Sequence, residues 1–411
     1  MTSAEPGASR SGIAYILGAT ALAGGLGYVI QAVVPAFTTT GDYVAFTVFW
    51  SAVYLVVAAI AGVQQEVTRA ARPRADGPSG RRELLRFGAG VATLFAVVVI
   101  ATSWLWAPSA FGNAAAGLIA PLAVAAAAYA LVATLSGVFY GARRWRAAAG
   151  LTVSDAGLRL LATMLALALG AGIVGLGWAV AVPFALAVAL MWLVSGRRAV
   201  GDVELDVTVR GLARNSASTV GGSLATGVMI SGLPLLLGIT ARSLGESDLA
   251  ALILVITLTR APLVIPLLAL QSYLVVTFRD APEHAARRTL TWGVALLGAT
   301  AVLAAAGAVV GPWIIDLLYS GRYDLPASVY AGVIAGAGLT AALCLTGAGA
   351  LASGRHGLYV GGWAIASGSL VVALLVTPAG VWPVVVAIAV APVIGIAVHL
   401  TALRRRAVAT P

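Results

Sequence analysis

The chain has 411 residues, of which 60% are hydrophobic and only 10% are charged. A soluble domain carries about a quarter charged residues, so this chain could not cover its surface with polar groups in water, and its composition indicates a membrane protein. The net charge of +10 comes from 25 basic residues, all of them arginine. In a membrane protein such a surplus belongs to cytoplasmic loops, which excludes the nucleic-acid partner that it would suggest in a soluble one.

Apolar stretches recur along the whole chain. Since a bilayer core needs about 20 apolar residues per helix, they predict an all-α polytopic fold of about twelve transmembrane helices. In chain order the helices are expected at residues 12–36, 43–65, 84–107, 115–140, 150–171, 173–195, 215–239, 248–275, 289–311, 327–352, 357–377 and 380–403.

The arginines fix the predicted topology. Of the 25, 21 lie on the two termini and the even-numbered connections, two (Arg242 and Arg322) lie on odd-numbered ones, and two fall inside helices. The positive-inside rule then places both termini in the cytoplasm of a multi-pass protein of the cell membrane. The longest outer connection, 312–326, holds Trp313, Tyr319 and Tyr323, as expected of an interfacial aromatic belt.

The two halves of the chain resemble each other. The segment 108–112 follows the third helix as 318–323 follows the ninth, and Leu135-Ser136-Gly137 matches Leu345-Thr346-Gly347, at an offset of about 210 residues. Parallel six-helix repeats of this kind are a transporter architecture. We therefore expect a lobe at 1–198, a cytoplasmic linker at 199–214 and a second lobe at 215–411.

Two arginines interrupt predicted helices. A charge at mid-bilayer costs at least about 2.5–3.5 kcal/mol on insertion scales, so each should face a cavity or a partner. Arg260, close to Pro262 and Pro266, is a candidate for binding an anionic substrate; the alternative is that it bonds to carbonyls freed by the prolines or to a neighbouring helix. Arg159 follows Asp155 by four residues on one helix face, which predicts either a structural ion pair or a site where Asp155 binds a coupling ion and Arg159 contacts substrate.

Further candidates lie on the predicted first, second and seventh helices. Glu66 and Arg69, three residues apart at the end of the second helix, form a candidate cytoplasmic gate or simply a solvated helix end. Gln31, Asn215 and Thr219 are candidate substrate-binding residues on polar stripes of repeat-equivalent helices. The alternative for these stripes is close helix packing by small residues.

Enzyme chemistry has little support in the sequence. There is no Walker sequence for ATP, no nucleophile beside a base, a single cysteine (Cys344), and three scattered histidines. We therefore expect no enzyme activity, no metal and no cofactor beyond a coupling ion or the membrane potential.

Several short motifs resemble one known family. They are Phe111-Gly112, Gly321-Arg322-Tyr323, Gly141-Ala142-Arg143-Arg144-Trp145 and Ser353-Gly354-Arg355-His356, with Arg159 in the fifth helix. In these features the chain resembles the multidrug/oligosaccharidyl-lipid/polysaccharide (MOP) exporter superfamily, specifically its polysaccharide-exporter and lipid-linked oligosaccharide flippase branch.

The resemblance implies a MATE-like, V-shaped pair of six-helix lobes around a cavity that opens alternately to each side. It implies export of a lipid-linked oligosaccharide or polysaccharide precursor whose lipid stays in the membrane, with Arg159 and Arg260 suited to a pyrophosphate. A proton or Na+ gradient or the membrane potential would drive the cycle. Glycosyltransferases and a polymerase of the same pathway would be the protein partners.

Other functions remain open at this stage. A cation-coupled multidrug (MATE-type) antiporter of the same superfamily is the main alternative, although its cavity would be acidic or apolar. A major facilitator transporter would show a Gly-x3-Asp-Arg/Lys-x-Gly-Arg/Lys motif, whereas the second connection runs from Gln64 to Arg74 without one. A membrane-embedded glycosyltransferase would need an acid pair or a histidine near the membrane surface, and none is evident.

Overall fold

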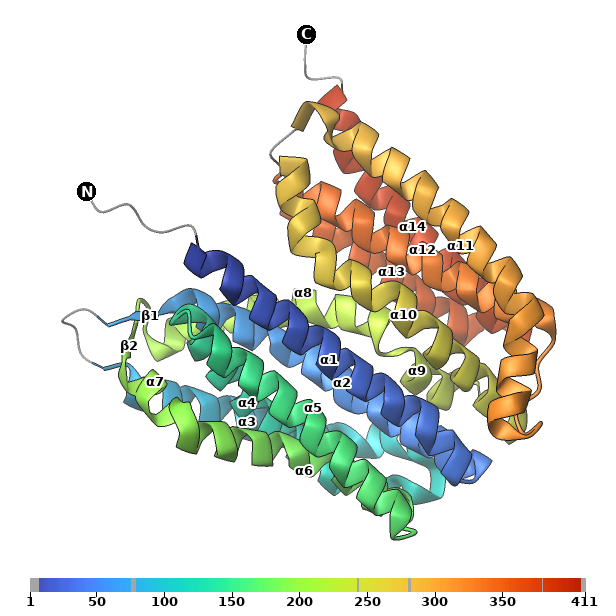
Figure 1. Ribbon diagram of the computed structural model, residues 1–411, viewed down its shortest axis with the longest axis horizontal. Helices are drawn as coiled ribbons and strands as arrows, with labels where there is room; N and C mark the ends of the chain where they lie inside the picture. Colours follow the sequence, from blue (N-terminus) through green and yellow to red (C-terminus); the bar gives the residue numbers. More distant parts are fainter. Residues whose placement is uncertain (1–6, 75–78, 242–243, 280–281, 379, 408–411) are drawn as a thin grey trace. The chain divides into compact units, whose positions relative to one another are not determined.

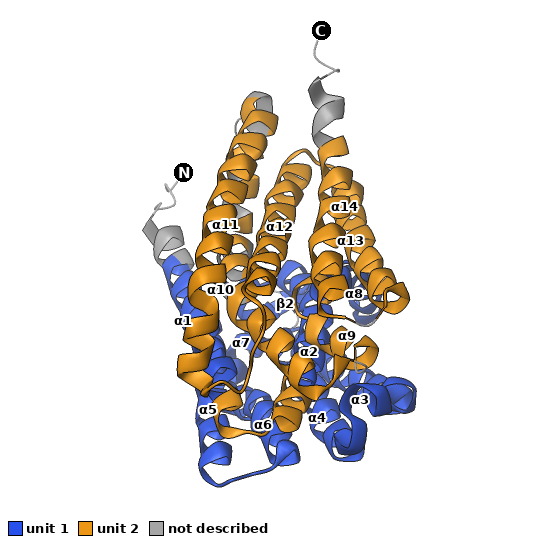
Figure 2. Ribbon diagram, turned by 90° about the vertical axis from the view of Figure 1, so that its right-hand side faces the viewer, with its two compact units in different colours: residues 1–33, 48–227 blue, residues 34–47, 228–411 orange. Residues whose placement is uncertain are grey.

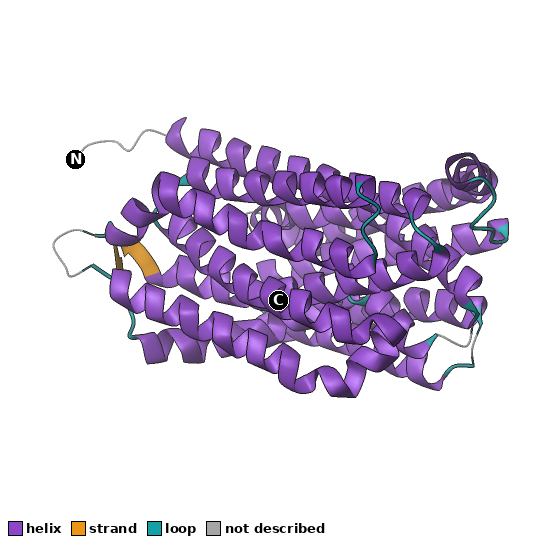
Figure 3. Cartoon of the chain, turned by 90° about the horizontal axis from the view of Figure 1, so that it is seen from below, coloured by secondary structure: helices purple, strands orange, loops and turns teal. Residues whose placement is uncertain are grey.

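Nearly all of the chain is helical, as the sequence predicts (Figures 1 and 3). The structure is a computed structural model that describes residues 7–74, 79–241, 244–279, 282–378 and 380–407. Its elements, in chain order, are α1 (Gly7–Phe37), α2 (Thr40–Ala70), β1 (Ala71–Pro73), α3 (Arg81–Phe111), the 3-10 turn η1 (Gly112–Ala114), α4 (Ala115–Gly141), α5 (Trp145–Ala168), α6 (Ile173–Met191), the π-helical turn η2 (Trp192–Gly196), α7 (Arg197–Gly201), β2 (Val203–Leu205), α8 (Val209–Ile230), α9 (Leu233–Thr240), α10 (Glu246–Arg279), α11 (Pro282–Tyr319), α12 (Ala327–Ala352), α13 (His356–Val376) and α14 (Val381–Ala407).

Most of these helices are long and apolar enough to cross a bilayer. The described residues contain ten such stretches, or eleven when the bent pair α8–α9 counts as one span. The longest stretch, Arg81–Gly141, contains both α3 and α4. Because these two helices pack against each other, the stretch holds two spans rather than one. The protein is therefore an all-α polytopic membrane protein, and each predicted helix has a counterpart.

The structure divides into two compact units (Figure 2). One comprises residues 1–33 and 48–227, and the other comprises residues 34–47 and 228–411. The boundaries fall inside α1, α2 and α8, and they differ from the predicted lobes in two segments. Residues 34–47 group with the second unit, whereas the linker and the first part of α8, up to residue 227, group with the first.

Each unit is built around one buried helix. In the first unit α4 packs against α3 and α6, and in the second α12 packs against α11 and α14. Both central helices are rich in alanine and glycine, which allow close approach. At Gly137 of α4, for example, a Cβ atom would lie 2.6 Å from the Cβ of Val67. Since α3, α4 and α6 correspond to α11, α12 and α14 in the predicted repeat, the packing partners repeat as well.

The predicted seventh helix is broken. Instead of one helix at 215–239, the chain forms α8 and α9, which bend by 70° across Ser231 and Gly232. Pro234 contributes to the break because it has no N–H to donate to the carbonyl of Ile230, four residues earlier. The break leaves backbone carbonyls at the end of α8 in need of donors.

The linker between the predicted halves contains an unpredicted strand. Ala71–Pro73 at the end of α2 pairs in antiparallel register with Val203–Leu205. Outside this two-stranded sheet, the Asp206 N–H donates to the carbonyl of Ala70. Both partners lie in the first unit, so the linker is fixed to the end of α2.

The predicted longest outer connection is shorter than expected. Helix α11 continues to Tyr319, so Trp313 and Tyr319 lie in this helix rather than in a loop. Arg242, predicted on another outer connection, lies outside the described residues.

Candidate functional site

Arg260 is buried near the middle of α10, with 9% of its surface exposed. Its Nη2 donates to the main-chain carbonyl of Met229 and, at 3.4 Å, to the hydroxyl of Thr340 on α12. The Met229 carbonyl belongs to the last turn of α8, just before the break. A cation at a helix C-terminus is stabilised by the helix dipole. The local structure therefore matches the second of the two sequence interpretations, an arginine bonded to a neighbouring helix.

The charge of Arg260 is nevertheless only partly compensated. Among the residues that the structure describes, no carboxylate forms a salt bridge with it. Its Nε is buried and has no hydrogen-bond partner there. A buried guanidinium without an anion retains both its charge and an unused N–H donor.

Three buried hydroxyl groups form a cluster in the second unit, and one of them belongs to the helix of Arg260. Thr257 precedes Arg260 by three residues, so both lie on one side of α10. The hydroxyls of Thr257 and Thr47 are close to the Tyr43 phenol. In the described part of the chain, none of the three buried hydroxyls has a hydrogen-bond partner outside this cluster. Sequence reasoning missed this cluster because its members come from distant segments of the chain.

The predicted pair Asp155–Arg159 is formed within α5. Arg159 is 2% exposed, and its Nη1 also donates to the hydroxyl of Tyr54 on α2 at 2.9 Å. Its guanidinium lies 4.0 Å from the ring centre of Phe184 and 5.8 Å from that of Trp50. These are favourable cation–π distances, so Arg159 is held by an acid, a phenol and aromatic rings of the first unit.

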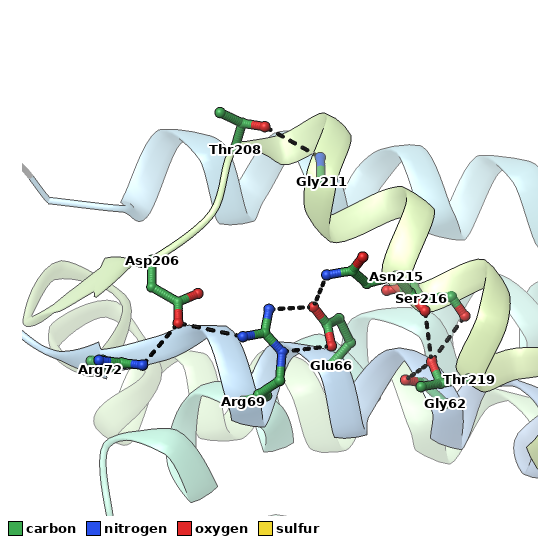
Figure 4. Close-up of polar contacts among 10 residues, drawn as sticks. All are labelled: Gly62, Glu66, Arg69, Arg72, Asp206, Thr208, Gly211, Asn215, Ser216 and Thr219. Carbon is green, nitrogen blue, oxygen red and sulfur yellow. Dashed lines mark hydrogen bonds and ion pairs between the residues drawn. The ribbon is translucent and has the colours of Figure 1, made fainter.

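The predicted gate residues Glu66 and Arg69 lie in a larger polar cluster (Figure 4). The Arg69 guanidinium donates to both carboxylate oxygens of Glu66, at 2.6 and 2.9 Å. Glu66, only 5% exposed, also accepts a 2.8 Å hydrogen bond from the Asn215 amide on α8. Asp206 accepts hydrogen bonds from Arg69 and Arg72. Glu66 is therefore buried in a polar cluster, whereas Arg69, with 48% of its side chain exposed, also fits the predicted alternative of a solvated helix end.

Thr219 lies one turn along α8 from Asn215. Its hydroxyl donates to the carbonyl of Gly62 on α2 at 2.8 Å (Figure 4). A Cβ atom at Gly62 would lie 2.5 Å from the nitrogen of Val220, so the two backbones touch here. The structure thus brings together Asn215 and Thr219, predicted to bind substrate, with Glu66 and Arg69, predicted to form a gate.

The remaining candidate, Gln31 on α1, is buried in the first unit, and its Oε1 has no partner among the described residues. Arg159 and Arg260 belong to different units. The structure therefore groups the other candidates into three places, the Arg260 environment, the Arg159 pair and the Glu66 cluster, and Gln31 belongs to none of them.

A fourth polar group surrounds the segment Gly321-Arg322-Tyr323. Arg322 donates to the carbonyls of Pro35 and Thr38 at 3.2 and 2.9 Å, and the Tyr323 hydroxyl donates to Pro35 at 3.2 Å. Tyr43 packs edge-on against Tyr323. Positive φ at Gly321 turns the chain here. These donors cap the C-terminal carbonyls of α1, a role that the sequence motif did not indicate.

The chain is similar along nearly its whole length to mycobacterial proteins. An uncharacterized protein of Mycobacterium bovis is 33% identical over 98% of this chain and 94% of its own. An uncharacterized protein of Mycobacterium tuberculosis is 32% identical over 97% of this chain and 93% of its own. No family model matches the chain.

Solved structures show which fold this is. A MATE-family multidrug resistance transporter of the MOP superfamily, in an inward-facing conformation, matches 96% of both chains with a TM-score of 0.67 and 16% identity. The chain belongs to the family of these mycobacterial proteins, and its fold is that of the MOP superfamily.

Two further MOP structures have the same fold. The lipid II flippase MurJ, in an inward closed conformation, matches 94% of this chain and 86% of its own with a TM-score of 0.71 and 12% identity. A MOP superfamily transporter from Pyrococcus furiosus, described as having a binding pocket of reversed polarity, matches 98% of this chain and 99% of its own with a TM-score of 0.62 and 14% identity. The fold implied by the MOP resemblance stated from the sequence is therefore confirmed.

Proposed function

We propose that this protein is a transporter that moves a negatively charged, lipid-linked saccharide precursor across the cell membrane by alternating access. The lipid would remain in the bilayer while the charged sugar headgroup crosses through the protein. The observation that carries the proposal is the environment of Arg260, a buried cation in a membrane helix without a carboxylate partner in the described part of the chain.

An arginine of this kind suits a phosphate or pyrophosphate. Its planar guanidinium binds phosphoryl oxygens through charge-assisted hydrogen bonds, and the unused Nε of Arg260 supplies one such donor. A bound anion would compensate the charge that the Met229 carbonyl and the Thr340 hydroxyl leave exposed to an apolar interior.

The buried hydroxyl groups of the second unit support a polar ligand rather than an apolar drug. Buried hydroxyls usually satisfy their hydrogen-bonding capacity, and those of Tyr43, Thr47 and Thr257 have, among the described residues, no partner outside their own cluster. Phosphoryl and sugar oxygens are acceptors of the kind that such groups bind. This supports a saccharide phosphate over a lipophilic cation as substrate.

A cation-coupled multidrug antiporter is the second candidate. Its support is Asp155, an acid inside α5, together with the fold of the MATE transporters. Against it, Asp155 is paired with Arg159 inside an aromatic surround, which favours the structural interpretation of both residues.

The remaining functional features are proposals of the same kind. We place both termini in the cytoplasm, with a proton or Na+ gradient or the membrane potential as driving force. Glycosyltransferases and a polymerase that make and use the saccharide would work beside the transporter. Glu66 and Arg69 would act at a cytoplasmic gate with Asn215 and Thr219.

Reconstituted protein tests the proposal. Proteoliposomes would contain a labelled polyprenyl-pyrophosphate saccharide, and transfer between leaflets would be followed by its accessibility to an impermeant enzyme. We expect wild-type protein to exceed empty liposomes clearly, and Arg260→Gln to fall to their level while still inserting. Arg82→Gln, which removes an exposed arginine of α3, is the matched control and should retain transport. Wild-type rates equal to those of empty liposomes under every applied gradient would refute the proposal.

A further inference from the structure

His399 is an ionisable residue that none of the roles above uses. It lies in α14, within the candidate span Val381–Thr401, and is fully buried at 0% exposure. Ionisable side chains inside membrane bundles are costly, and they commonly mark ion or proton pathways. The partners of the ring therefore decide what His399 can do.

Both ring nitrogens of His399 face oxygen atoms. Nε2 lies 3.1 Å from the main-chain carbonyl of Tyr359 on α13. Nδ1 lies 3.1 Å from the hydroxyl of Thr346 on α12. The Thr346 hydroxyl in turn lies 3.1 Å from the carbonyl of Leu343. Since a carbonyl can only accept, Nε2 carries a hydrogen, and the protonation state of the ring is decided at Nδ1.

The Thr346 hydroxyl allows either state at Nδ1. When the ring is neutral, the Thr346 hydroxyl donates to Nδ1 and no longer donates to the Leu343 carbonyl. When the ring is protonated, Nδ1–H donates to the hydroxyl oxygen, and the hydroxyl hydrogen turns to the Leu343 carbonyl. The proton therefore binds at Nδ1 with a full set of hydrogen bonds in both states, and only one hydroxyl rotates.

The packing around the ring is fitted to it. A Cβ atom at Gly362 of α13 would overlap the imidazole, and one at Gly347 of α12 would lie 3.3 Å from its Cε1. The Tyr359 ring stacks on the imidazole, with centres 6.1 Å apart and planes 7° from parallel. Glycines on two helices thus make room for a side chain that the same helices hydrogen-bond.

Few other titratable groups face the ring. On α13 the group in contact is the Tyr359 phenol. On α12 the titratable residue nearest to Thr346 in the sequence is Cys344, which interacts with Arg260 of α10. In the part of the chain that the structure describes, His399 forms no salt bridge. The charge of the imidazole is therefore set by protonation at Nδ1, without a salt bridge to a carboxylate in the described residues.

Tyr359 connects this ring to α10, the helix of Arg260. The Gln271 amide of α10 donates to the Tyr359 hydroxyl at 3.2 Å, and Tyr359 contacts His399 through its carbonyl and its ring. A change at His399 can thus reach α10 through α13.

We propose that His399 is a proton-binding site that couples transport to a proton gradient. The inference rests on the proposed transport function, and it gives that function a coupling residue in the second unit, distinct from Asp155. Protonation at Nδ1 and release from it would accompany the transport cycle, with the Thr346 hydroxyl and the Tyr359–Gln271 link carrying the change to α10.

Nitrogen NMR of the histidine ring tests the site without any substrate. The full chain would carry ¹⁵N-histidine in nanodiscs, with His284→Gln and His356→Gln leaving one signal set. Both replaced residues are exposed. We expect the His399 signals to change from a neutral to a doubly protonated ring between about pH 5 and 8, and Thr346→Val to move this midpoint to lower pH. A ring that stays neutral across the whole range would overturn the proposal.

A transport assay distinguishes a coupling role of His399 from a structural one. In proteoliposomes with an imposed pH gradient, His399→Gln keeps a donor for Tyr359 but cannot titrate. We expect it to lose the stimulation by the gradient while keeping transport without one. Stimulation equal to wild type in this variant, or none in wild type, would contradict coupling at His399. If wild type fails to transport, the proposed function fails, yet the NMR result still decides whether His399 binds a proton; the same holds if His399→Gln does not fold.

Discussion

Replacement of Gly62 by alanine is expected to separate α2 from α8. A Cβ atom there would lie 2.5 Å from the nitrogen of Val220 and 2.6 Å from the carbonyl carbon of Thr219. Both are backbone atoms, so no side chain can rotate away to make room, and the two helices must move apart. This movement would also stretch the 2.8 Å hydrogen bond from the Thr219 hydroxyl to the Gly62 carbonyl.

The size of the effect follows from three contributions. Overpacking of a close contact costs about 1–3 kcal/mol, and loss of a neutral hydrogen bond costs about 1 kcal/mol. Alanine in place of glycine inside a helix returns about 0.5–1 kcal/mol. We therefore expect Gly62→Ala to lower the free energy of unfolding by about 1–3.5 kcal/mol.

The assay is reversible unfolding in nanodiscs, followed by tryptophan fluorescence. The matched control is Gly221→Ala on α8, where a Cβ atom would meet nothing within 4 Å. This variant should be as stable as wild type or more stable by up to about 1 kcal/mol. If Gly62→Ala proves as stable as Gly221→Ala, the close approach of α2 and α8 is refuted.

Three further predictions follow from the same structure. Asp155→Asn should lower the free energy of unfolding by about 3–5 kcal/mol, because it leaves Arg159 buried without its carboxylate; chemical unfolding of this variant with wild-type stability would show that the pair is dispensable. Arg322→Gln should cost about 1 kcal/mol through loss of its bonds to the end of α1, measured in the same assay, whereas Arg82→Gln should cost nothing. A green fluorescent protein fused after Pro411 should fluoresce and an alkaline phosphatase fused there should be inactive, and the opposite pair of results would reverse the predicted topology.

The helices were the most predictable part of the fold, because apolar length alone marks a span. The predicted helix at 327–352 coincides with α12. The strands could not be predicted, since each has three residues, too few for an alternating pattern, and Pro73 argues against a strand. The break at Ser231 and Gly232 was not predicted. Pro234 lies next to it, but a proline in an apolar segment is equally compatible with a helix that kinks and continues.

Local spacing predicted local contacts in the candidate site. Four residues between Asp155 and Arg159, and three between Glu66 and Arg69, gave pairs that the structure forms. Contacts between segments that are distant in the sequence could not be predicted. Asn215 lies 149 residues from Glu66, and no periodicity in one sequence connects them. The roles of these residues in binding, coupling and gating stay predictions.

The division of the chain into units has a consequence for biosynthesis. The first unit includes α8 up to residue 227, and the second includes residues 34–47. A membrane protein emerges from the ribosome N-terminus first, so residues 34–47 are made before any other part of the unit to which they belong. Buried side chains of the early segment, such as Tyr43 and Phe46, must wait until the segment carrying Tyr323 has been inserted. If the protein were made as two separate halves, divided at the linker, each half would lack a segment of its own unit. Assembly therefore includes a late step that requires the complete second unit.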